Sequence, residues 1–459
     1  MGMSRGATVA APLPVRPSLD RVVVINDECV ERGGAAGIAL SSVRSLRRLE
    51  IPVTFLCGDD GANPELEQLG VDVVPLGGRH IMNGMRGAAA ARGLFDRTTL
   101  SAIRGWIDTN DTAGTVYHLH NWHKVLSPSI FAALSGLGSR LLVSAHDYFL
   151  ACPNGGFFHY PRGHICALTP ASAACVLSSC DRRHYGHKLW RLARHQVRRA
   201  VFDLGSTPAT IIAVHDGMIP YLQRAGIPAR SIRVLRNPVT PWRSARVAAE
   251  SNRDVFFVGR LEKDKGVDLL ARAARRAGAR LRIIGDGPLR QELSRDHPEV
   301  ELLGWRSRQE IGDLIGEARM LVVPTRWPET FGLVSVEALT SGLPVIMSRF
   351  SLISGEVVRL GLGLACDPHD EAELAAAIRR FGEDDSEVKS FSHRAFADAR
   401  QLAPTPERWC ADLIGLYEDA LQRSAELAFG VNSPHQVLRD ALDQSPARRQ
   451  SAHAHSLTR

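Results

Sequence analysis

The sequence predicts an α/β protein made of two successive units, each with a parallel β-sheet covered by helices on both faces. Short apolar runs such as RVVVIND at 21–27 alternate with helix-like segments from the start of the chain, and this alternation is typical of parallel sheets. The alternation breaks at Asn237-Pro238 and restarts at residue 254. We therefore expect one unit to end near residue 238 and a second to begin near 239. A chain of 459 residues is long enough for two large domains.

Several expected strands end in polar residues, as buried parallel strands do. In the first unit the strands are expected at 21–27, 51–57, 71–76, 115–121, 140–147, 210–216 and 231–239, and the helices around 34–49, 92–107 and 124–136. In the second unit the strands are expected at 255–259, 281–285, 300–304, 320–324 and 343–347. A further helix is predicted over 406–425, because apolar residues recur there at helical spacing.

Composition narrows the class of protein. Fifty-six basic and 49 acidic residues give a net charge of +7, which favours an acidic partner without identifying it. Residues 1–20 hold no apolar core of a signal peptide, and we expect this segment to be flexible. No run of 18 apolar residues occurs, which disfavours a membrane span. Eight cysteines then indicate mostly reduced thiols in a cytoplasmic protein, and the polar segment 430–459 is expected to be disordered.

The stretch PTRWPETFGLVSVEALTSGLP, residues 324–344, places Glu329 eight residues before Glu337. Pro328 disfavours helix before Glu329, whereas VSVEAL is typical of a first helical turn, so we expect one carboxylate on a loop and the other on a helix. A carboxylate beside the free amides of a helix start suits oxygen-rich ligands such as sugars and phosphates. A solvated loop entering an ordinary helix is the alternative.

Two more segments follow predicted strands, where functional residues of parallel sheets gather. Glu31-Arg32-Gly33-Gly34 is a glycine loop whose missing β-carbons would let a diphosphate approach the backbone, or a turn that simply needs glycine. His120-Asn121 and His146-Asp147 each stand at a strand end. The near-neutral pKa of histidine suits proton transfer, although such residues also serve as structural hydrogen-bonding groups.

These motifs together resemble the retaining GT4 glycosyltransferases of the GT-B superfamily. The 324–344 stretch resembles their E-x7-E signature, and VFFVGRLEKDKGVDLL, LRIIGDGPLRQEL and LLGWRSRQEI precede it in the order typical of the family. The glycine loop, H-x-H-N at 118–121 and HDYFLACPNG at 146–155 also resemble family landmarks. The resemblance implies a GT-B fold: two Rossmann-like domains with parallel sheets facing a central cleft. Residues 21–238 would bind the acceptor, 239–405 the nucleotide sugar, and helix 406–425 would cross back to the first domain.

The resemblance also implies roles for individual residues. Arg260 and Lys265 would bind the donor diphosphate, Glu337 the ribose and Glu329 the donor sugar. The remaining donor-binding candidates are Gly33, Gly34, Phe331, Gly332 and Leu333. His120 is the candidate for acting on the acceptor, with Asn121 and His146 beside it, so the predicted catalytic set is His120, Arg260, Lys265 and Glu329. The sequence contains no D-x-D motif, so we expect no metal and no cofactor besides the nucleotide sugar as co-substrate.

Two further features leave alternatives open. In 182–202, Tyr185, Leu189, Leu192, Val197 and Val201 form an apolar stripe, and Arg183, His187, Arg191, Arg194 and Arg198 occupy another side. Such a helix either binds an anionic membrane surface, making the protein peripheral on the inner leaflet, or is a solvated face of a packed helix. Cys152, Cys166, Cys175 and Cys180 lack the paired C-x2-C spacing of a zinc site, so unpaired thiols are favoured over a structural metal.

The resulting prediction is a retaining glycosyltransferase that moves a sugar from a nucleotide-sugar donor to a hydroxyl acceptor, which would be a sugar or a lipid-linked sugar in cell-surface polysaccharide or glycolipid synthesis. A nucleotide-sugar epimerase of the same fold and a degenerate, non-catalytic nucleotide-binding protein are the alternatives. Nucleic acid is not an expected partner, because the sequence contains no recognisable nucleic-acid-binding module.

Overall fold

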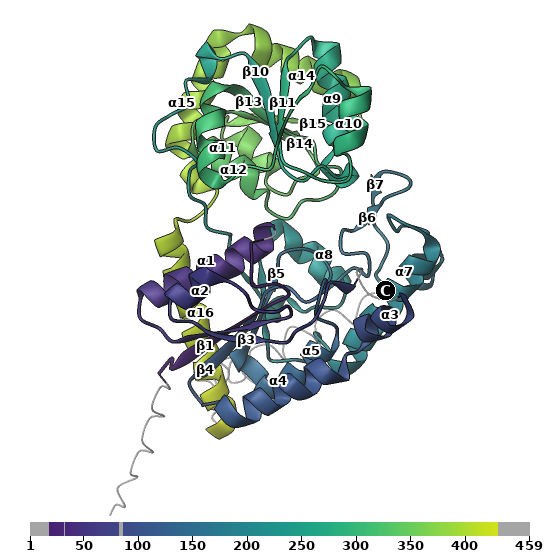
Figure 1. The fold of residues 1–459 in the computed structure, drawn as a ribbon, viewed down its shortest axis with the longest axis vertical. Helices are drawn as coiled ribbons and strands as arrows, with labels where there is room; N and C mark the ends of the chain where they lie inside the picture. Colours follow the sequence, from purple (N-terminus) through teal and green to yellow (C-terminus); the bar gives the residue numbers. More distant parts are fainter. Residues whose placement is uncertain (1–17, 32, 82–85, 430–459) are drawn as a thin grey trace, which may run out of the picture.

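The computed structural model describes residues 18–31, 33–81 and 86–429, which form two α/β domains one above the other (Figure 1). The segments predicted to be flexible, 1–20 and 430–459, lie outside the described residues except for 18–20.

The first domain contains a seven-stranded sheet in which every pair is parallel, in the order β3-β2-β1-β4-β5-β8-β9. Its strands are β1 (Arg21–Asn26), β2 (Val53–Cys57), β3 (Asp72–Pro75), β4 (Thr115–Leu119), β5 (Leu141–Ala145), β8 (Thr210–Ala213) and β9 (Ile232–Val234). Successive residues of β1 point to opposite faces: Val22 and Val24 join one hydrophobic cluster, and Val23 and Ile25 join another. Because both faces are covered, β1 is apolar throughout.

Helices from opposite ends of the sequence cover one face of this sheet. Helix α1 (Gly34–Arg48) contributes Ile38 and Val43 to the cluster that holds Val22, and the final helix α16 (Pro406–Phe429) contributes Leu413 and Tyr417. Figure 1 shows α16 running from the second domain down along the first. The described chain therefore ends on the domain where it began.

The second domain contains a six-stranded parallel sheet in the order β12-β11-β10-β13-β14-β15. Its strands are β10 (Asp254–Val258), β11 (Leu281–Ile284), β12 (Glu301–Gly304), β13 (Ala318–Val323), β14 (Val345–Ser348) and β15 (Gly363–Cys366). The sequence analysis missed β15, whose four residues GLAC carry little strand signal. Helix α9 (Val267–Ala277) packs against α14 (Glu371–Glu383), and α12 (Leu333–Thr340) packs against α15 (Asp385–Asp398).

Two predicted helices differ from the structure. The helix expected at 92–107 is split into α3 (Arg86–Leu94) and α4 (Arg97–Asn110), because the Asp96 side chain accepts hydrogen bonds from the amides of Thr98 and Thr99 and starts a new helix. The helix expected at 124–136 begins only at Ser129 as α5 (Ser129–Leu134) and continues as a 3-10 helix to Arg140.

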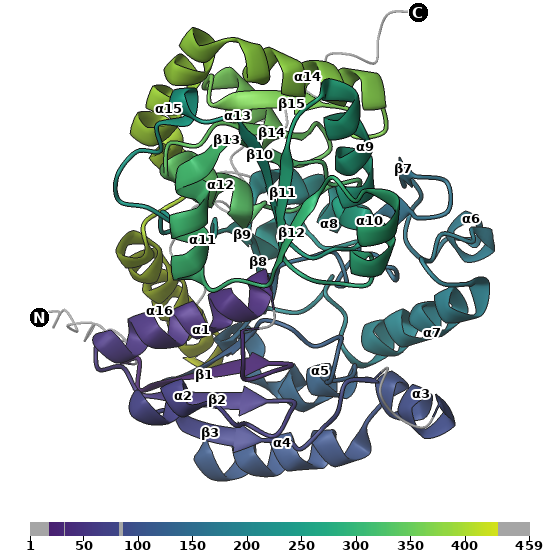
Figure 2. The same cartoon turned by 45° about the horizontal axis from the view of Figure 1, so that its top comes forward.

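Both sheets reverse their strand order at one place, between β1 and β4 in the first domain and between β10 and β13 in the second. Ligands of open α/β sheets bind beyond the carboxyl ends of the strands at such switch points. The start of α1 lies beneath the second domain in Figure 2, and a β-carbon placed on Gly34 would lie 3.1 Å from Leu333 Cδ1. The loops at the two switch points therefore face each other.

Candidate active site

A cavity of about 470 Å³ opens between the two domains, and both contribute to its wall. Lining residues include Gly33, Gly34, Asn121, His123, Lys124, Asp147, Arg182 and Arg191 from the first domain, and Arg260, Glu262, Asp264, Lys265 and Trp327 from the second. Two residues with predicted catalytic roles, Arg260 and Lys265, are thus in the wall.

The two predicted glutamates lie on a loop and on a helix, as expected. Glu329 lies in the loop after β13, and Glu337 lies in α12. The Lys265 ammonium, from the loop after β10, forms an ion pair with Glu329 Oε1. Glu329 Oε2 is buried without a hydrogen-bond partner among the described residues. The pair therefore joins the loops after β10 and β13 of the second domain and leaves one carboxylate oxygen without a partner among the described residues.

The start of α12 offers further unpaired groups. Gly332 precedes this helix with a φ of 74°, a conformation that favours glycine. The hydroxyls of Ser335 and Ser351 are buried without a partner in the described part of the chain, and both lie within 3.8 Å of where a Gly332 β-carbon would be. Phe331 is buried in the hydrophobic core, so only its backbone could meet a ligand. Polar atoms without partners therefore surround the first helical turn.

Glu337 is held differently from Glu329. Its carboxylate forms an ion pair with Arg308, whose guanidinium also donates to the carbonyl of Thr240. Burial raises the pKa of Glu337, and the nearby Arg308 opposes this rise. The carboxylate predicted to bind ribose is therefore paired with a side chain that is half exposed.

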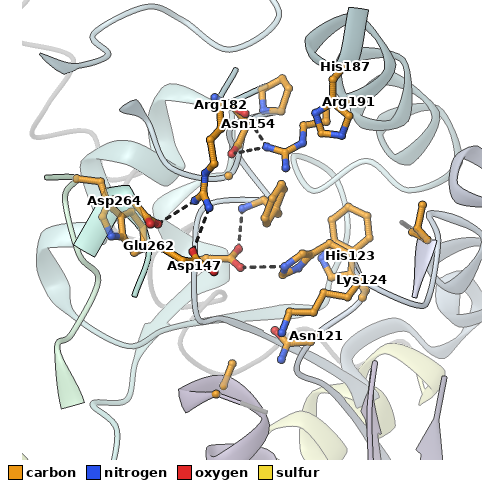
Figure 3. A pocket seen from close by; sticks show the side chains of 18 of the residues that line it. Asn121, His123, Lys124, Asp147, Asn154, Arg182, His187, Arg191, Glu262 and Asp264 are labelled. Carbon is orange, nitrogen blue, oxygen red and sulfur yellow. Dashed lines mark hydrogen bonds and ion pairs between the residues drawn. The ribbon is translucent and has the colours of Figure 1, made fainter. Parts of the chain in front are cut away.

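An arginine of the first domain reaches across the cavity. Arg182 donates to Glu262 at 3.0 Å and to Asp264 at 2.9 Å (Figure 3). Glu262 also accepts a 2.9 Å hydrogen bond from Arg260. The acidic residues that flank the predicted diphosphate-binding cations are therefore paired with the first domain.

The predicted acceptor-side residues come together, although two of them do not line the cavity. His120 Nδ1 lies 2.9 Å from His146 Nε2, and their rings stack. Burial lowers the pKa of His120 well below its ordinary value, and its Nε2 has no partner among the described residues. The side chain in the wall is Asn121. The buried His120 and the half-buried His146 thus form a pair next to the cavity, and burial lowers the pKa of both.

The sequence analysis missed the pair that does line the wall, His123 and Asp147. His123 Nε2 lies 3.7 Å from Asp147 Oδ2 (Figure 3). The His123 ring also stacks on Phe149. Burial raises the pKa of Asp147 to about 6 and lowers that of His123 well below its ordinary value. The sequence could have indicated both residues by their positions, because Asp147 follows His146 and His123 comes shortly after His120-Asn121.

Two family models match consecutive parts of the chain. "Glycosyl transferase 4-like domain" matches residues 33–238, and "Glycosyl transferases group 1" matches residues 239–398. The chain belongs to the group 1 glycosyltransferase family. The predicted family is therefore confirmed.

A curated relative matches part of the chain in sequence, and two solved structures match most of it in fold. The glycogen synthase of Mycobacterium tuberculosis is 29% identical over 257 residues, which is 52% of this chain and 59% of that protein. This chain spans about half the length of the curated relatives that it matches. Sucrose-phosphate synthase from Thermosynechococcus elongatus aligns over 88% of this chain and 100% of its own, with a TM-score of 0.65 and 17% identity. Anabaena HepE, solved with UDP and glucose, aligns over 86% and 98%, with a TM-score of 0.58 and 17% identity. The predicted GT-B fold is confirmed.

In this group 1 family member, two buried charges hold the loop that carries His123. Asp27 accepts hydrogen bonds of 2.8–2.9 Å from four successive backbone amides, those of residues 123–126. From the other side, Arg194 donates to the carbonyls of Trp122, His123 and Leu126. The loop is therefore fixed outside a helix, which explains why the helix predicted from residue 124 starts only at Ser129.

The same arginine corrects the prediction for residues 182–202. Helix α7 (Tyr185–Val201) turns Arg194 and Arg198 into the protein, where both are buried and bind backbone carbonyls, whereas Tyr185 and Leu189 are exposed. The predicted basic face toward an anionic membrane is therefore wrong for these arginines, because buried carbonyls require donors. In the part of the chain that the structure describes, no helix is long and apolar enough to span a membrane.

Two groups of side chains could be considered for a metal in the described residues. Cys29 lies with Asp59 and Asp60, and His215 lies with Asp216 and Glu356. The second group is already engaged, since Arg236 forms ion pairs with both carboxylates. In the first, Asp59 accepts a hydrogen bond from the Cys29 amide, and burial raises the pKa of the Cys29 thiol to about 12. Neither group offers a set of free ligands.

Proposed function

We propose that this chain is a retaining glycosyltransferase that moves a sugar from a nucleotide-sugar donor to a hydroxyl acceptor, in the synthesis of a cell-surface polysaccharide or glycolipid. The observation that carries this proposal is the contact between Lys265 and Glu329. It places a cation and a half-satisfied carboxylate at the start of α12, opposite the glycine loop at Gly33-Gly34. A donor needs these two groups for its phosphate and its sugar hydroxyls.

Arg260 and Lys265 would bind the donor diphosphate. Each is paired with a carboxylate in the structure, Arg260 with Glu262 and Lys265 with Glu329. Phosphate oxygens would replace these carboxylates, and negative charge would grow on the leaving phosphate as the glycosidic bond breaks. Fixed cations stabilise that charge more in the transition state than in the ground state. The Anabaena structure with UDP and glucose supports a nucleotide sugar as donor.

Glu329, released from Lys265, would accept hydrogen bonds from the donor sugar. Glu337 would bind the ribose after Arg308 moves aside. The acceptor would enter along Asn121, His123 and Asp147, which line the first-domain wall. Its hydroxyl would attack from the face that the phosphate leaves, which retains the anomeric configuration. The departing phosphate would take the proton, and His120, which lies next to the cavity and whose Nε2 has no partner among the described residues, would help to position the acceptor.

We propose that transfer needs no metal ion, because the sequence has no D-x-D motif and cationic side chains stand where a metal would hold the diphosphate. The only co-substrate is then the nucleotide sugar, and the acceptor is a sugar or a lipid-linked sugar presented in the cytoplasm.

The test is a donor screen in EDTA with UDP-, GDP- and ADP-sugars and simple glycoside acceptors. We expect one nucleotide series to release nucleoside diphosphate, and NMR of the product to show the donor's anomeric configuration. An inverted product would contradict the retaining mechanism. Activity that requires added magnesium or manganese would contradict the metal-free mechanism. An epimerase would be recognised because it changes the donor sugar without transferring it.

A further inference from the structure

Four of the eight cysteines lie in the segment before α7, around a lysine that the proposed reaction does not use. Cys152, Cys175 and Cys180 are buried, Cys166 is half-buried, and all four are free thiols. Lys188 on α7 has no exposed surface. A buried lysine is costly unless its donors are satisfied, so its neighbours indicate what the site does.

The Lys188 nitrogen has three close neighbours. It lies 3.0 Å from the carbonyl oxygen of Cys175, 3.1 Å from Cys180 Sγ and 3.6 Å from Cys175 Sγ. These contacts match the three donors of a lysine side chain. Burial lowers the pKa of Lys188, but the hydrogen bond to Cys180 and the nearby Cys175 and Cys152 outweigh it, so that the pKa is raised overall. The structure thus holds an amine and a thiol in contact, away from bulk water.

We propose that Lys188 and Cys180 form an oxidant-sensitive pair that becomes covalently joined when the protein meets a peroxide. In the first step the Cys180 thiol reduces one hydrogen peroxide to water and becomes a sulfenic acid. In the second step Lys188 first gives one proton to solvent, and its free amine then attacks that sulfur. The nitrogen–sulfur bond forms, the sulfur–oxygen bond breaks, and the hydroxyl leaves as water with a proton from the amine. Sulfenic acids condense with thiols to form disulfides and with a backbone nitrogen to form sulfenamides, and the proposed step places the Lys188 amine in the role of that nitrogen.

The pair is close enough to the cavity for a small oxidant to reach it. Asn154 lines the cavity, and its side-chain amide donates to the Cys180 carbonyl at 2.9 Å and approaches Cys180 Sγ at 3.8 Å. Hydrogen peroxide is nearly as small as water, and the proposal places its approach at Asn154, between the cavity and Cys180.

The bond would also act on the cleft. Cys180 comes two residues before Arg182, which bridges to Glu262 and Asp264 of the second domain. Joining Cys180 to α7 would hold this segment in place while Arg182 is engaged. Oxidation would thereby stiffen the connection between the domains next to the diphosphate-binding cations. The covalent step itself does not depend on the proposed transferase activity.

The experiment is peptide mapping of the full-length chain, reduced and then treated with hydrogen peroxide. The intact mass should fall by about 2 Da, trypsin should no longer cleave after Lys188, and a thiol reductant should reverse both changes. Lys188→Arg keeps a buried cation and a trypsin site but has no simple amine, so its Cys180 should instead gain about 32 Da as sulfinic acid. Cys180→Ser should abolish the crosslink. Cys366→Ser, which removes another buried thiol, should retain it.

Three results would overturn the proposal. The first is a disulfide between Cys175 and Cys180 with cleavage after Lys188 unchanged. The second is zinc or iron bound by these cysteines at about one atom per chain in the purified protein, lost in the Cys180→Ser variant. The third is a wild-type chain that peroxide leaves without any change at Cys180. If Lys188→Arg fails to fold, the comparison of Cys180→Ser with Cys366→Ser still decides the outcome.

Discussion

Lys265 and Glu329 lie 64 positions apart in the chain, yet the ammonium of the first contacts a carboxylate oxygen of the second. The two residues follow β10 and β13, the strands between which the second sheet reverses its order. Because one oxygen of Glu329 has no partner among the described residues, we propose that the contact is exchanged on donor binding, when a phosphate would bind the lysine and a sugar the carboxylate. The first prediction follows from this exchange.

Alanine substitution of the two glutamates should affect nucleotide binding and turnover differently. Glu329→Ala removes a neutralising partner from Lys265, so affinity for the free nucleoside diphosphate should be kept or improved, while turnover and discrimination among donor sugars should fall. Glu337→Ala removes a ribose contact made by donor and product alike, so both should bind more weakly, by about 1.5–3 kcal/mol if that contact is charge-assisted. Isothermal titration with the free nucleotide, set beside initial rates with the donor, separates the two cases. Equal weakening of nucleotide binding in both variants would show that the carboxylates share one site.

Arg194 should matter for stability rather than for membrane binding. Its guanidinium donates to three carbonyls of the 122–126 loop, so Arg194→Met should lower the free energy of unfolding by on the order of 3 kcal/mol. Arg199 is exposed on the same helix, and Arg199→Met should change it by no more than about 0.5 kcal/mol. Urea unfolding of the two variants provides the comparison. Equal stability would mean that the loop does not depend on this clamp.

Asp147 should make stability depend on pH. Burial raises its pKa from 3.8 to about 6, so the folded protein holds the proton more tightly than the unfolded chain does. The free energy of unfolding should therefore fall as pH rises from about 4 to 6, by at most about 3 kcal/mol from this group. The Asp147→Asn variant has no carboxyl group to titrate at this position, so its free energy of unfolding should not fall for this reason. The difference in free energy of unfolding between the variant and wild type, measured in urea, should therefore favour the variant more at pH 7 than at pH 4.5.

The control for this prediction is Asp203, a carboxylate with the opposite shift. Hydrogen bonds from the Gly205 amide and the Ser206 hydroxyl lower the pKa of Asp203. Its contribution is present above its ordinary pKa and is lost as pH falls, so Asp203→Asn should not gain stability as pH rises. A pH-independent difference between Asp147→Asn and wild type would contradict the assigned pKa shift.

Much of the fold was predictable because parallel strands are buried on both faces. The run Val22–Ile25 is apolar at every position for this reason, and the expected strands coincide with β1, β2 and β10. The E-x7-E spacing also sufficed to place Glu329 on a loop and Glu337 on α12, since Pro328 and the helix-forming run after Gly332 act locally. Local chemistry therefore determined these features.

The errors arose where distant residues decide the outcome. Periodicity in 182–202 revealed an apolar stripe and a basic stripe but not which one faces inward. The loop carbonyls that accept hydrogen bonds from Arg194 lie about 70 residues earlier in the chain. These carbonyls determine that the arginine side of the helix faces inward. Likewise Asp27 keeps residues 123–126 out of a helix from almost 100 positions away. The His123–Asp147 pair was missed because its two members approach only when β4 and β5 are neighbours.

The central claim is that Arg260 and Lys265 bind the donor diphosphate without a metal ion. Isothermal titration in EDTA with the nucleoside diphosphate chosen by the donor screen tests it most directly. We expect wild type and Lys263→Ala, an exposed lysine of the same turn, to bind equally. Lys265→Ala and Arg260→Ala should each bind more weakly by about 1.5–3 kcal/mol, which is roughly ten- to a hundredfold in Kd. Unchanged affinity in both variants, or binding that appears only when magnesium is added, would contradict the account.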